Sequence, residues 1–305
     1  EPDVWGRDIK MGIGTWAWGD RLLWSYGRDH TDADLEAAYR ASLAGGIRLF
    51  DTAEFYGLGR SERLLGQFIR AEGVPVKVAT KFVPFPWRPR RQNLLAALRR
   101  SLDRLGLETL DLYMMHVPLP PVPINTWMEA MADAVEAGLT RAVGVSNYSV
   151  RQMRTAHRAL ARRGLSLASN QVLYNLLRRG PERNGLMDAC QELDVRLVAY
   201  SPLAQGLLTG KYTPEQPLPG IRGLRYGRRQ LAQAAPLIDL LREIGQAHGD
   251  RQPAQVALNW VIAKGALPIP GAKNARQAES NAGALSWSLT AAEVEALDAA
   301  SDAVG

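Results

Sequence analysis

The stretch Leu110-Asp111-Leu112-Tyr113-Met114-Met115-His116 opens a pattern that repeats along the whole chain. It is a short apolar run of the kind that forms buried strands, and residues 125–137 after it carry apolar side chains at helical spacing. Residues 141–146 then form a second β-type run. A strand, a helix and a second strand in this order are typical of a parallel βαβ unit.

The same alternation extends in both directions from this unit. We predict eight strands, at residues 11–15, 48–52, 76–81, 110–116, 141–146, 169–172, 196–200 and 267–270. Helices are predicted between and after them at residues 32–44, 61–71, 91–105, 125–137, 149–163, 182–193, 253–264 and 275–284. Eight strands alternating with eight helices favour a closed (β/α)8 TIM barrel, an α/β fold, over an open sheet. No linker divides the chain, so we expect a single domain over residues 1–305.

Two helical stretches, residues 232–248 and 290–301, fall outside this repeat and are predicted to be extra C-terminal helices. Side-chain oxygens at Thr31 or Asp32, Ser61 and Ser149 are expected to cap the helices that begin there, because they can accept from unpaired amide groups. Thr290 and Glu293 form a capping-box pattern before the last helix.

Composition excludes several classes of protein. Of the 305 residues, 46% are hydrophobic and 22% are charged, a balance that argues against disorder. The chain contains no apolar run of about 18 residues, so no membrane span is expected. A single cysteine, Cys190, excludes an internal disulfide, and four dispersed histidines do not suggest a metal cluster. The net charge of +6 comes mainly from arginines scattered over helix faces, and without nucleic-acid-binding motifs we expect no nucleic acid partner.

Polar residues follow the predicted strands at the ends where barrel enzymes place their chemistry. They are Asp51, Lys81, His116, Ser146, Asn147, Gln171, Ser201 and Lys273. If the strand assignment holds, these eight side chains converge on one mouth of the barrel.

Four residues at or just after successive strand ends are suited to proton transfer: Asp51, Tyr56, Lys81 and His116. A free tyrosine has a pKa near ~10, and a nearby ammonium group such as that of Lys81 is expected to lower it. Asp51 would pair with Lys81 and hold it in place, while His116 would orient a carbonyl oxygen beside the phenol. Such a group can protonate a developing alkoxide.

The chain resembles the aldo-keto reductases, a superfamily of barrels that reduce carbonyl groups with NADPH. The resemblance rests on the four residues above and on the strings Phe50-Asp51-Thr52-Ala53-Glu54-Phe55-Tyr56-Gly57 and Val145-Ser146-Asn147-Tyr148. It covers essentially the whole chain and implies that Asp51, Tyr56, Lys81 and His116 are the catalytic tetrad. The chain most resembles the plant, algal and cyanobacterial branch that includes pyridoxal reductases.

The resemblance also implies where NADP(H) binds. Ser146, Asn147 and Gln171 match positions that hydrogen-bond the nicotinamide carboxamide, Tyr200 matches the residue that stacks on the ring, and Gly14, Thr15 and Trp16 border it. The pyrophosphate would be wrapped by Ser201, Pro202, Leu203, Gln205, Gly206, Leu208 and Lys211. The adenosine 2′-phosphate and adenine would be met by Gly271, Ala272, Lys273, Gln277 and Asn281, with Arg222 as a second cation for the phosphate. These cations favour NADP(H) over NAD(H).

Aromatic residues near the same strand ends predict an apolar substrate pocket, with Trp16 and Trp87 as its leading candidates. The sequence therefore predicts an NADPH-dependent reductase of a small carbonyl compound, with pyridoxal or another aromatic aldehyde as a candidate, acting as a monomer or weak oligomer. The alternative is a redox-sensing NADP(H)-binding regulatory subunit with slow turnover, similar to the potassium-channel β subunits. By the same resemblance we expect a chloroplast location, with a cytoplasmic one as the alternative.

Overall fold

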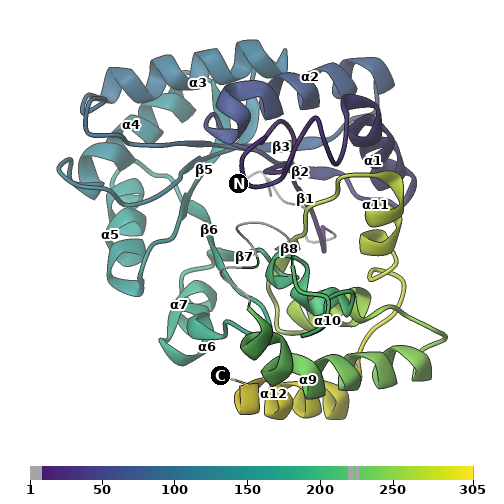
Figure 1. Cartoon of the computed structure of the whole chain (residues 1–305). Helices are drawn as coiled ribbons and strands as arrows, with labels where there is room; N and C mark the ends of the chain where they lie inside the picture. The colour runs from purple at the N-terminus through teal and green to yellow at the C-terminus, as the bar shows by residue number, and fades with distance from the viewer. Residues whose placement is uncertain (1–8, 219–222, 224–226, 305) are drawn as a thin grey trace.

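Eight parallel strands in sequential order form the centre of the computed structural model, which describes residues 9–218, 223 and 227–304 (Figure 1). The strands are β1 (Ile13–Gly14), β2 (Leu49–Asp51), β3 (Lys77–Phe82), β4 (Leu110–Met115), β5 (Thr140–Ser146), β6 (Leu167–Leu173), β7 (Arg196–Tyr200) and β8 (Leu267–Ile269). All eight lie within two residues of the predicted positions. The prediction of a (β/α)8 barrel is confirmed.

The barrel closes between β8 and β1. The amide nitrogens of Gly12 and Gly14 donate to the carbonyl oxygens of Pro268 and Pro270, each at 3.0 Å. Gly14 suits this close approach, because a Cβ there would stand 3.0 Å from the carbonyl oxygen of Ile269. Strand β1 is only two residues long, but the backbone hydrogen bonds of Gly12 and Gly14 still close the ring.

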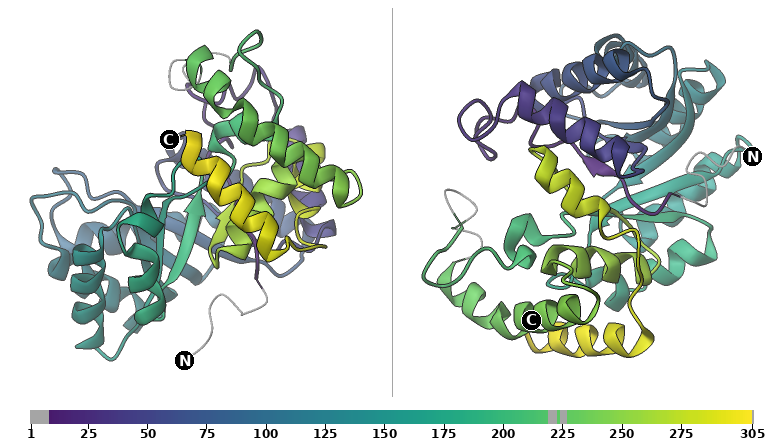
Figure 2. Two further views of the ribbon diagram at one scale, coloured as in Figure 1. Left: turned by 90° about the horizontal axis from the view of Figure 1, so that it is seen from below. Right: turned by 90° about the vertical axis from the view of Figure 1, so that its right-hand side faces the viewer.

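Helices surround this ring, and two further helices from the C-terminal third of the chain lie outside it (Figures 1 and 2). They are α1 (Asp32–Ala44), α2 (Arg60–Glu72), α3 (Arg91–Leu105), α4 (Ile124–Glu136), α5 (Val150–Ala161), α6 (Gly180–Arg183), α7 (Leu186–Glu192), α9 (Arg228–Ala247), α10 (Pro253–Ala263), α11 (Ala275–Ala282) and α12 (Ala291–Val304). The short 3₁₀ segments η1 (Tyr56–Gly59) and η2 (Ala204–Thr209) follow β2 and β7. Helices α9 and α12, the predicted additions, pack against each other.

Two expectations about helices were wrong. The single helix predicted at residues 182–193 is two helices, α6 and α7, because Gly185 between them takes a left-handed φ of 73°. Ser61 does not cap α2; it lies inside the first turn, and its hydroxyl bonds to Thr15 and Thr52 instead. Thr31 and Ser149 do cap α1 and α5, each within a capping box.

The core has two layers. Side chains from β2, β3, β4, β7 and β8 form the inner layer: Leu49, Ala79, Leu112, Met114, Val198, Leu267 and Ile269. A larger apolar layer lies between the strands and the helices, and it includes the buried Cys190. Burial raises the pKa of the Cys190 thiol to about 12, which disfavours the reactive thiolate.

Within the described ranges, no helix combines the length and apolarity that crossing a bilayer requires. The same part of the chain holds no group of three or more His, Cys, Asp or Glu side chains arranged for a metal ion.

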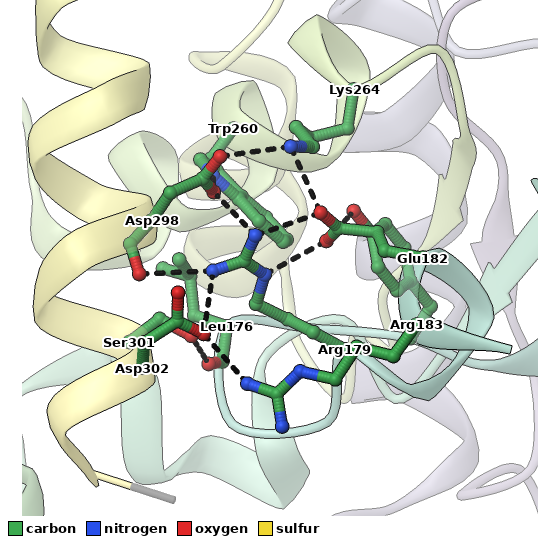
Figure 3. Close-up of polar contacts among 10 residues, drawn as sticks. Leu176, Arg179, Glu182, Arg183, Trp260, Lys264, Asp298, Ser301 and Asp302 are labelled. Carbon is green, nitrogen blue, oxygen red and sulfur yellow. Dashed lines mark hydrogen bonds and ion pairs between the residues drawn. The ribbon is translucent and has the colours of Figure 1, made fainter.

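An ionic cluster fastens α12 to the barrel (Figure 3). The Arg179 guanidinium donates to Glu182 through two nitrogens, at 2.9 and 2.8 Å, and to the backbone oxygen of Asp298 at 2.9 Å. Lys264 Nζ lies 3.0 Å from Glu182 Oε2 and 2.9 Å from Asp298 Oδ2, and Trp260 Nε1 donates to Asp298 Oδ1 at 2.9 Å. Since each charge meets an opposite partner, the cluster can stay ionised although it is largely buried.

The cluster makes stability depend on pH through Glu182. Burial raises the pKa of its carboxyl, but hydrogen bonds from Arg179, Tyr174 and Lys264 outweigh burial and hold the pKa at about 2. Because the folded-state pKa lies below the unfolded value near ~4.3, this stabilisation is present above that value and is lost as the pH falls through the folded pKa. It amounts to at most about 3 kcal/mol.

We predict that Glu182→Gln destabilises the protein at pH 7 and flattens the loss of stability on acidification. Urea unfolding at pH 7 and pH 3 measures both effects, and Glu108→Gln, on an exposed position, is the control. Equal free energies of unfolding for Glu182→Gln and wild type at pH 7 would contradict this role.

Candidate active site

The four predicted tetrad residues meet at the C-terminal mouth of the barrel. Asp51 is the last residue of β2, Lys81 lies near the end of β3, and His116 follows β4. Tyr56 begins η1, just after β2. Groups from three separate parts of the chain are brought together because parallel strands end at the same rim.

Lys81 is the centre of this group and its side chain is fully buried. Its Nζ donates to Asp51 Oδ1 at 2.5 Å and to the backbone oxygen of Thr52 at 2.8 Å, and it lies 3.5 Å from the Tyr56 hydroxyl. Burial lowers the pKa of Lys81, but the attraction of Asp51 and the bonds it makes outweigh this, and the net pKa is raised. Lys81 therefore stays an ammonium at neutral pH.

Tyr56 differs from expectation in one respect. Lys81 does lower the pKa of its phenol, as predicted, but burial raises it by more, and the net pKa lies above the ordinary value. The expectation of a net lowering was wrong for this structure because desolvation penalises the phenolate. The phenol is consequently protonated at neutral pH and lies beside the Lys81 ammonium.

His116 is neutral. Burial, and then the charge of Lys81, lower the pKa of its imidazole to about 3. The ring lies edge-on to the Tyr56 ring with centroids 5.9 Å apart. Its Nδ1 is buried and has no hydrogen-bond partner in the described part of the chain. A neutral imidazole beside the phenol can donate one N–H to an incoming oxygen without adding a second cation.

A polar layer continues from the tetrad across β5, β6 and β7. Ser146 Oγ donates to the backbone oxygen of Gln171 at 2.9 Å, and Asn147 Nδ2 donates to Ser146 Oγ at 3.0 Å. The Tyr200 hydroxyl donates to Asn147 Oδ1 at 3.1 Å. Gln171 Nε2 donates to Asp51 Oδ2 at 2.8 Å, a contact that the sequence did not predict. The predicted carboxamide-binding residues are thus adjacent to the proton-transfer group.

The loop after β7 has the backbone that close approach to a ligand needs. Positive φ values occur at Ser201 (50°), Ala204 (49°), Gln205 (57°) and Gly206 (104°). Asn175 Nδ2 fixes the start of this loop by donating to the Ser201 backbone oxygen at 2.9 Å. The loop and η2 hold the remaining residues predicted to wrap the pyrophosphate: Pro202, Leu203, Leu208 and, after Gly210, Lys211.

The segment after β8 forms the other side of this face. Gly271 bridges to Gly14, and the backbone oxygen of Ala272 accepts from Trp18 Nε1 at 2.9 Å. Asn281 Nδ2 donates to the Gly271 oxygen at 3.2 Å. These contacts set Gly271 and Ala272 beside β1. The predicted phosphate ligand Arg222 lies outside the described residues.

Lys273 and Gln277 lie at the start of α11. The Lys273 backbone nitrogen donates to Gln277 Oε1 at 2.9 Å, and the Lys273 ammonium lies 5.7 Å from the centre of the Trp24 ring. Asn274 caps this helix by accepting from the Gln277 backbone nitrogen at 3.0 Å. A helix N-terminus with a neighbouring ammonium favours an anion.

Aromatic side chains stand around the phenol. Trp16 stacks on Tyr56 with centroids 6.1 Å apart, and Trp24 meets Trp16 edge-on. Trp87, the other predicted pocket residue, is 73% exposed and stacks on Phe85 at 4.6 Å. Among the described residues, Trp87 makes a ring contact with Phe85 but none with Tyr56. Phe85 contacts the exposed Phe55, so these rings form one exposed aromatic group.

Sequence reasoning missed the residues that hold this aromatic group and the tetrad in place. Glu54 accepts from both terminal nitrogens of Arg88, at 2.6 and 3.1 Å, and from the Val83 backbone nitrogen. Ser61 bonds to Thr15 at 2.7 Å and to Thr52 at 2.9 Å, and Thr52 supplies the backbone oxygen that holds Lys81. A polar Ser61 on the buried face of an amphipathic helix was the one sequence signal available.

The sequence matches the model of the aldo/keto reductase family over residues 10–302. It is 44% identical over 293 residues to pyridoxal reductase, chloroplastic, of Arabidopsis thaliana, covering 92% of this chain and 80% of that protein. It is 40% identical to the uncharacterized oxidoreductase Rv2298 of Mycobacterium tuberculosis, covering 96% and 89%.

Two solved structures are similar throughout. The glycerol dehydrogenase AKR11B4 of Gluconobacter oxydans superimposes with a TM-score of 0.83 at 27% identity, covering 95% of this chain and 90% of that one. An aldo/keto reductase of Klebsiella pneumoniae in complex with NADP and acetate superimposes with a TM-score of 0.76 at 32% identity, with the same coverage. The resemblance inferred from the sequence is confirmed.

We predict that His116 does not titrate between pH 5 and pH 9, because burial and Lys81 disfavour its protonated form. Nuclear magnetic resonance of the histidine rings, assigned with His116→Gln, measures this directly. Titration of the assigned ring with a midpoint near ~6.5 would contradict the neutral assignment.

Proposed function

This chain belongs to the aldo/keto reductase family, and we propose that it reduces an aldehyde or ketone to an alcohol with NADPH, with Tyr56 as the proton donor. The observation that carries the proposal is the buried Lys81 ammonium, bonded to Asp51 and 3.5 Å from the Tyr56 hydroxyl. This arrangement gives the barrel mouth an acid whose conjugate base is stabilised by a fixed charge.

The residues at the mouth suit NADP(H). Amide and hydroxyl groups of Ser146, Asn147 and Gln171 lie next to the tetrad and offer both donors and acceptors for a carboxamide. Left-handed backbone at Gln205 and Gly206 lets the chain pass close to a pyrophosphate. When bound, the nicotinamide would supply the hydride that goes to the carbonyl carbon.

The proton step follows from the chain's own residues. As charge develops on the carbonyl oxygen, Tyr56 donates its proton to that oxygen, forming the alcohol and leaving a phenolate. Lys81 stabilises this phenolate until solvent returns a proton. The raised pKa of Tyr56 keeps the phenol protonated before the reaction, and neutral His116 donates a hydrogen bond that positions the substrate oxygen.

An aromatic aldehyde is the proposed substrate class, with pyridoxal as the specific candidate. Trp16 stacks on Tyr56, and Trp24, Phe55, Phe85 and Trp87 form further ring contacts nearby. Flat rings of this kind suit a flat aromatic substrate. The identity to a plant pyridoxal reductase supports the choice. Because this relative is named as chloroplastic, we propose a plastid location, with a cytoplasmic location as the alternative.

We predict that Tyr56→Phe lowers kcat by at least ~10³-fold while the Kd for NADPH changes less than about threefold, since the hydroxyl acts on the substrate. Stopped-flow NADPH oxidation and fluorescence titration give the two values. Wild-type turnover in the variant would refute Tyr56 as the acid. Tight NADPH binding by the wild type without turnover of pyridoxal, nitrobenzaldehyde or methylglyoxal would favour the regulatory-subunit alternative.

Lys273→Met should weaken NADPH binding about tenfold and leave NADH binding unchanged, because an ammonium at a helix N-terminus stabilises the extra phosphate. Separate fluorescence titrations with the two cofactors measure this, with Lys264→Met, in the distant ionic cluster, as the control. An equal loss of affinity for both cofactors would contradict a phosphate-specific role.

A further inference from the structure

The Asp51 carboxylate has two partners on opposite oxygens. Oδ1 accepts from Lys81 Nζ at 2.5 Å, and Oδ2 accepts from Gln171 Nε2 at 2.8 Å. Asp51 and Gln171 are each only 3% exposed, and they are 120 positions apart in the sequence. Together with the 3.5 Å contact between Lys81 Nζ and the Tyr56 hydroxyl, these two bonds form a continuous path from Gln171 through Asp51 and Lys81 to Tyr56.

Gln171 is held firmly at its backbone by the polar layer. Its carbonyl oxygen accepts from Ser146 Oγ at 2.9 Å and from the Asn147 backbone nitrogen at 2.9 Å. With the backbone fixed and Nε2 committed to Asp51, the Oε1 atom is the part of the amide suited to accept from a carboxamide N–H. The same side chain can therefore serve both a ligand and the tetrad.

We propose that Gln171 is a positioning residue that sets the acidity of Tyr56 through Asp51 and Lys81, in addition to binding the nicotinamide. The nicotinamide-binding role rests on the proposed function, whereas the effect on the acidity of Tyr56 does not. By donating to Oδ2, Gln171 takes up part of the Asp51 charge and limits the pull of Asp51 on Lys81. The ammonium can then lie between the carboxylate and the phenol.

Removing this donor has a definite direction. Asp51 would attract Lys81 more strongly, and less of the ammonium charge would act on Tyr56. The Tyr56 hydroxyl is already the most distant of the three oxygen atoms that Lys81 Nζ contacts, at 3.5 Å. The phenolate would lose stabilisation, and the pKa of Tyr56 would rise. Among the described residues, the titratable groups facing the phenol are Asp51, Lys81, His116 and Tyr200, and all of them remain in the variant.

The test is a spectrophotometric titration of tyrosinate in the cofactor-free protein. Tyr56 is isolated by subtracting the titration of the matching protein that also carries Tyr56→Phe. The variants are Gln171→Met, which keeps the size of the side chain without its N–H, and Gln171→Glu, which places a second carboxylate beside Asp51. Gln255→Met, at a buried glutamine of α10, is the control.

Both Gln171 variants are expected to raise the Tyr56 midpoint by about half a pH unit or more, Gln171→Glu by the larger amount, with no change in Gln255→Met. An unchanged midpoint in either folded Gln171 variant would overturn the proposal.

NADPH titration and wild-type turnover keep the two proposals apart. Loss of NADPH affinity in Gln171→Met with an unchanged Tyr56 midpoint would leave the reductase function standing and refute the link to Tyr56. A shifted midpoint in a protein whose wild type reduces no carbonyl compound would support the link and refute the function.

Discussion

The structure of the barrel mouth depends on one buried cation. A fully buried ammonium is costly unless it is paired and hydrogen-bonded, and Lys81 meets both conditions through Asp51 and the Thr52 backbone. The pair fixes the ends of β2 and β3 relative to each other. It also explains the neighbours' protonation states, because the same charge that stabilises a Tyr56 phenolate disfavours a protonated His116.

Around this pair, hydroxyl groups and backbone atoms keep the segment that carries Tyr56 in place. Ser61 ties the end of β1 to the end of β2 from inside α2, and Glu54 with Arg88 fastens the loop after β3. The phenol therefore lies on a short 3₁₀ turn that is anchored on both sides. These hydrogen bonds fix the position of the proposed proton donor relative to the barrel mouth.

The order of elements was predictable because strand and helix periodicities alternate without interruption. The meeting of Asp51, Tyr56, Lys81 and His116 at one rim was predictable because the strand ends carry polar groups. Local breaks were not: Gly185 splits a helix by adopting a left-handed φ, although the apolar spacing runs on. Ser61 was assigned to a cap because its partners Thr15 and Thr52 meet it only in three dimensions. The bond between Gln171 and Asp51 and the raised pKa of Tyr56 also depend on packing across the barrel.

Single-turnover NADPH oxidation by Lys81→Met/Asp51→Asn with an aromatic aldehyde tests whether the buried cation enables proton transfer. This double variant removes both charges together, so no unpaired ion is left in the core. We expect that NADPH still binds and that the rate of its oxidation falls by at least ~10²-fold, because the phenolate formed at Tyr56 loses its stabilising charge. A rate close to that of the wild type would contradict the claim that the buried cation enables proton transfer.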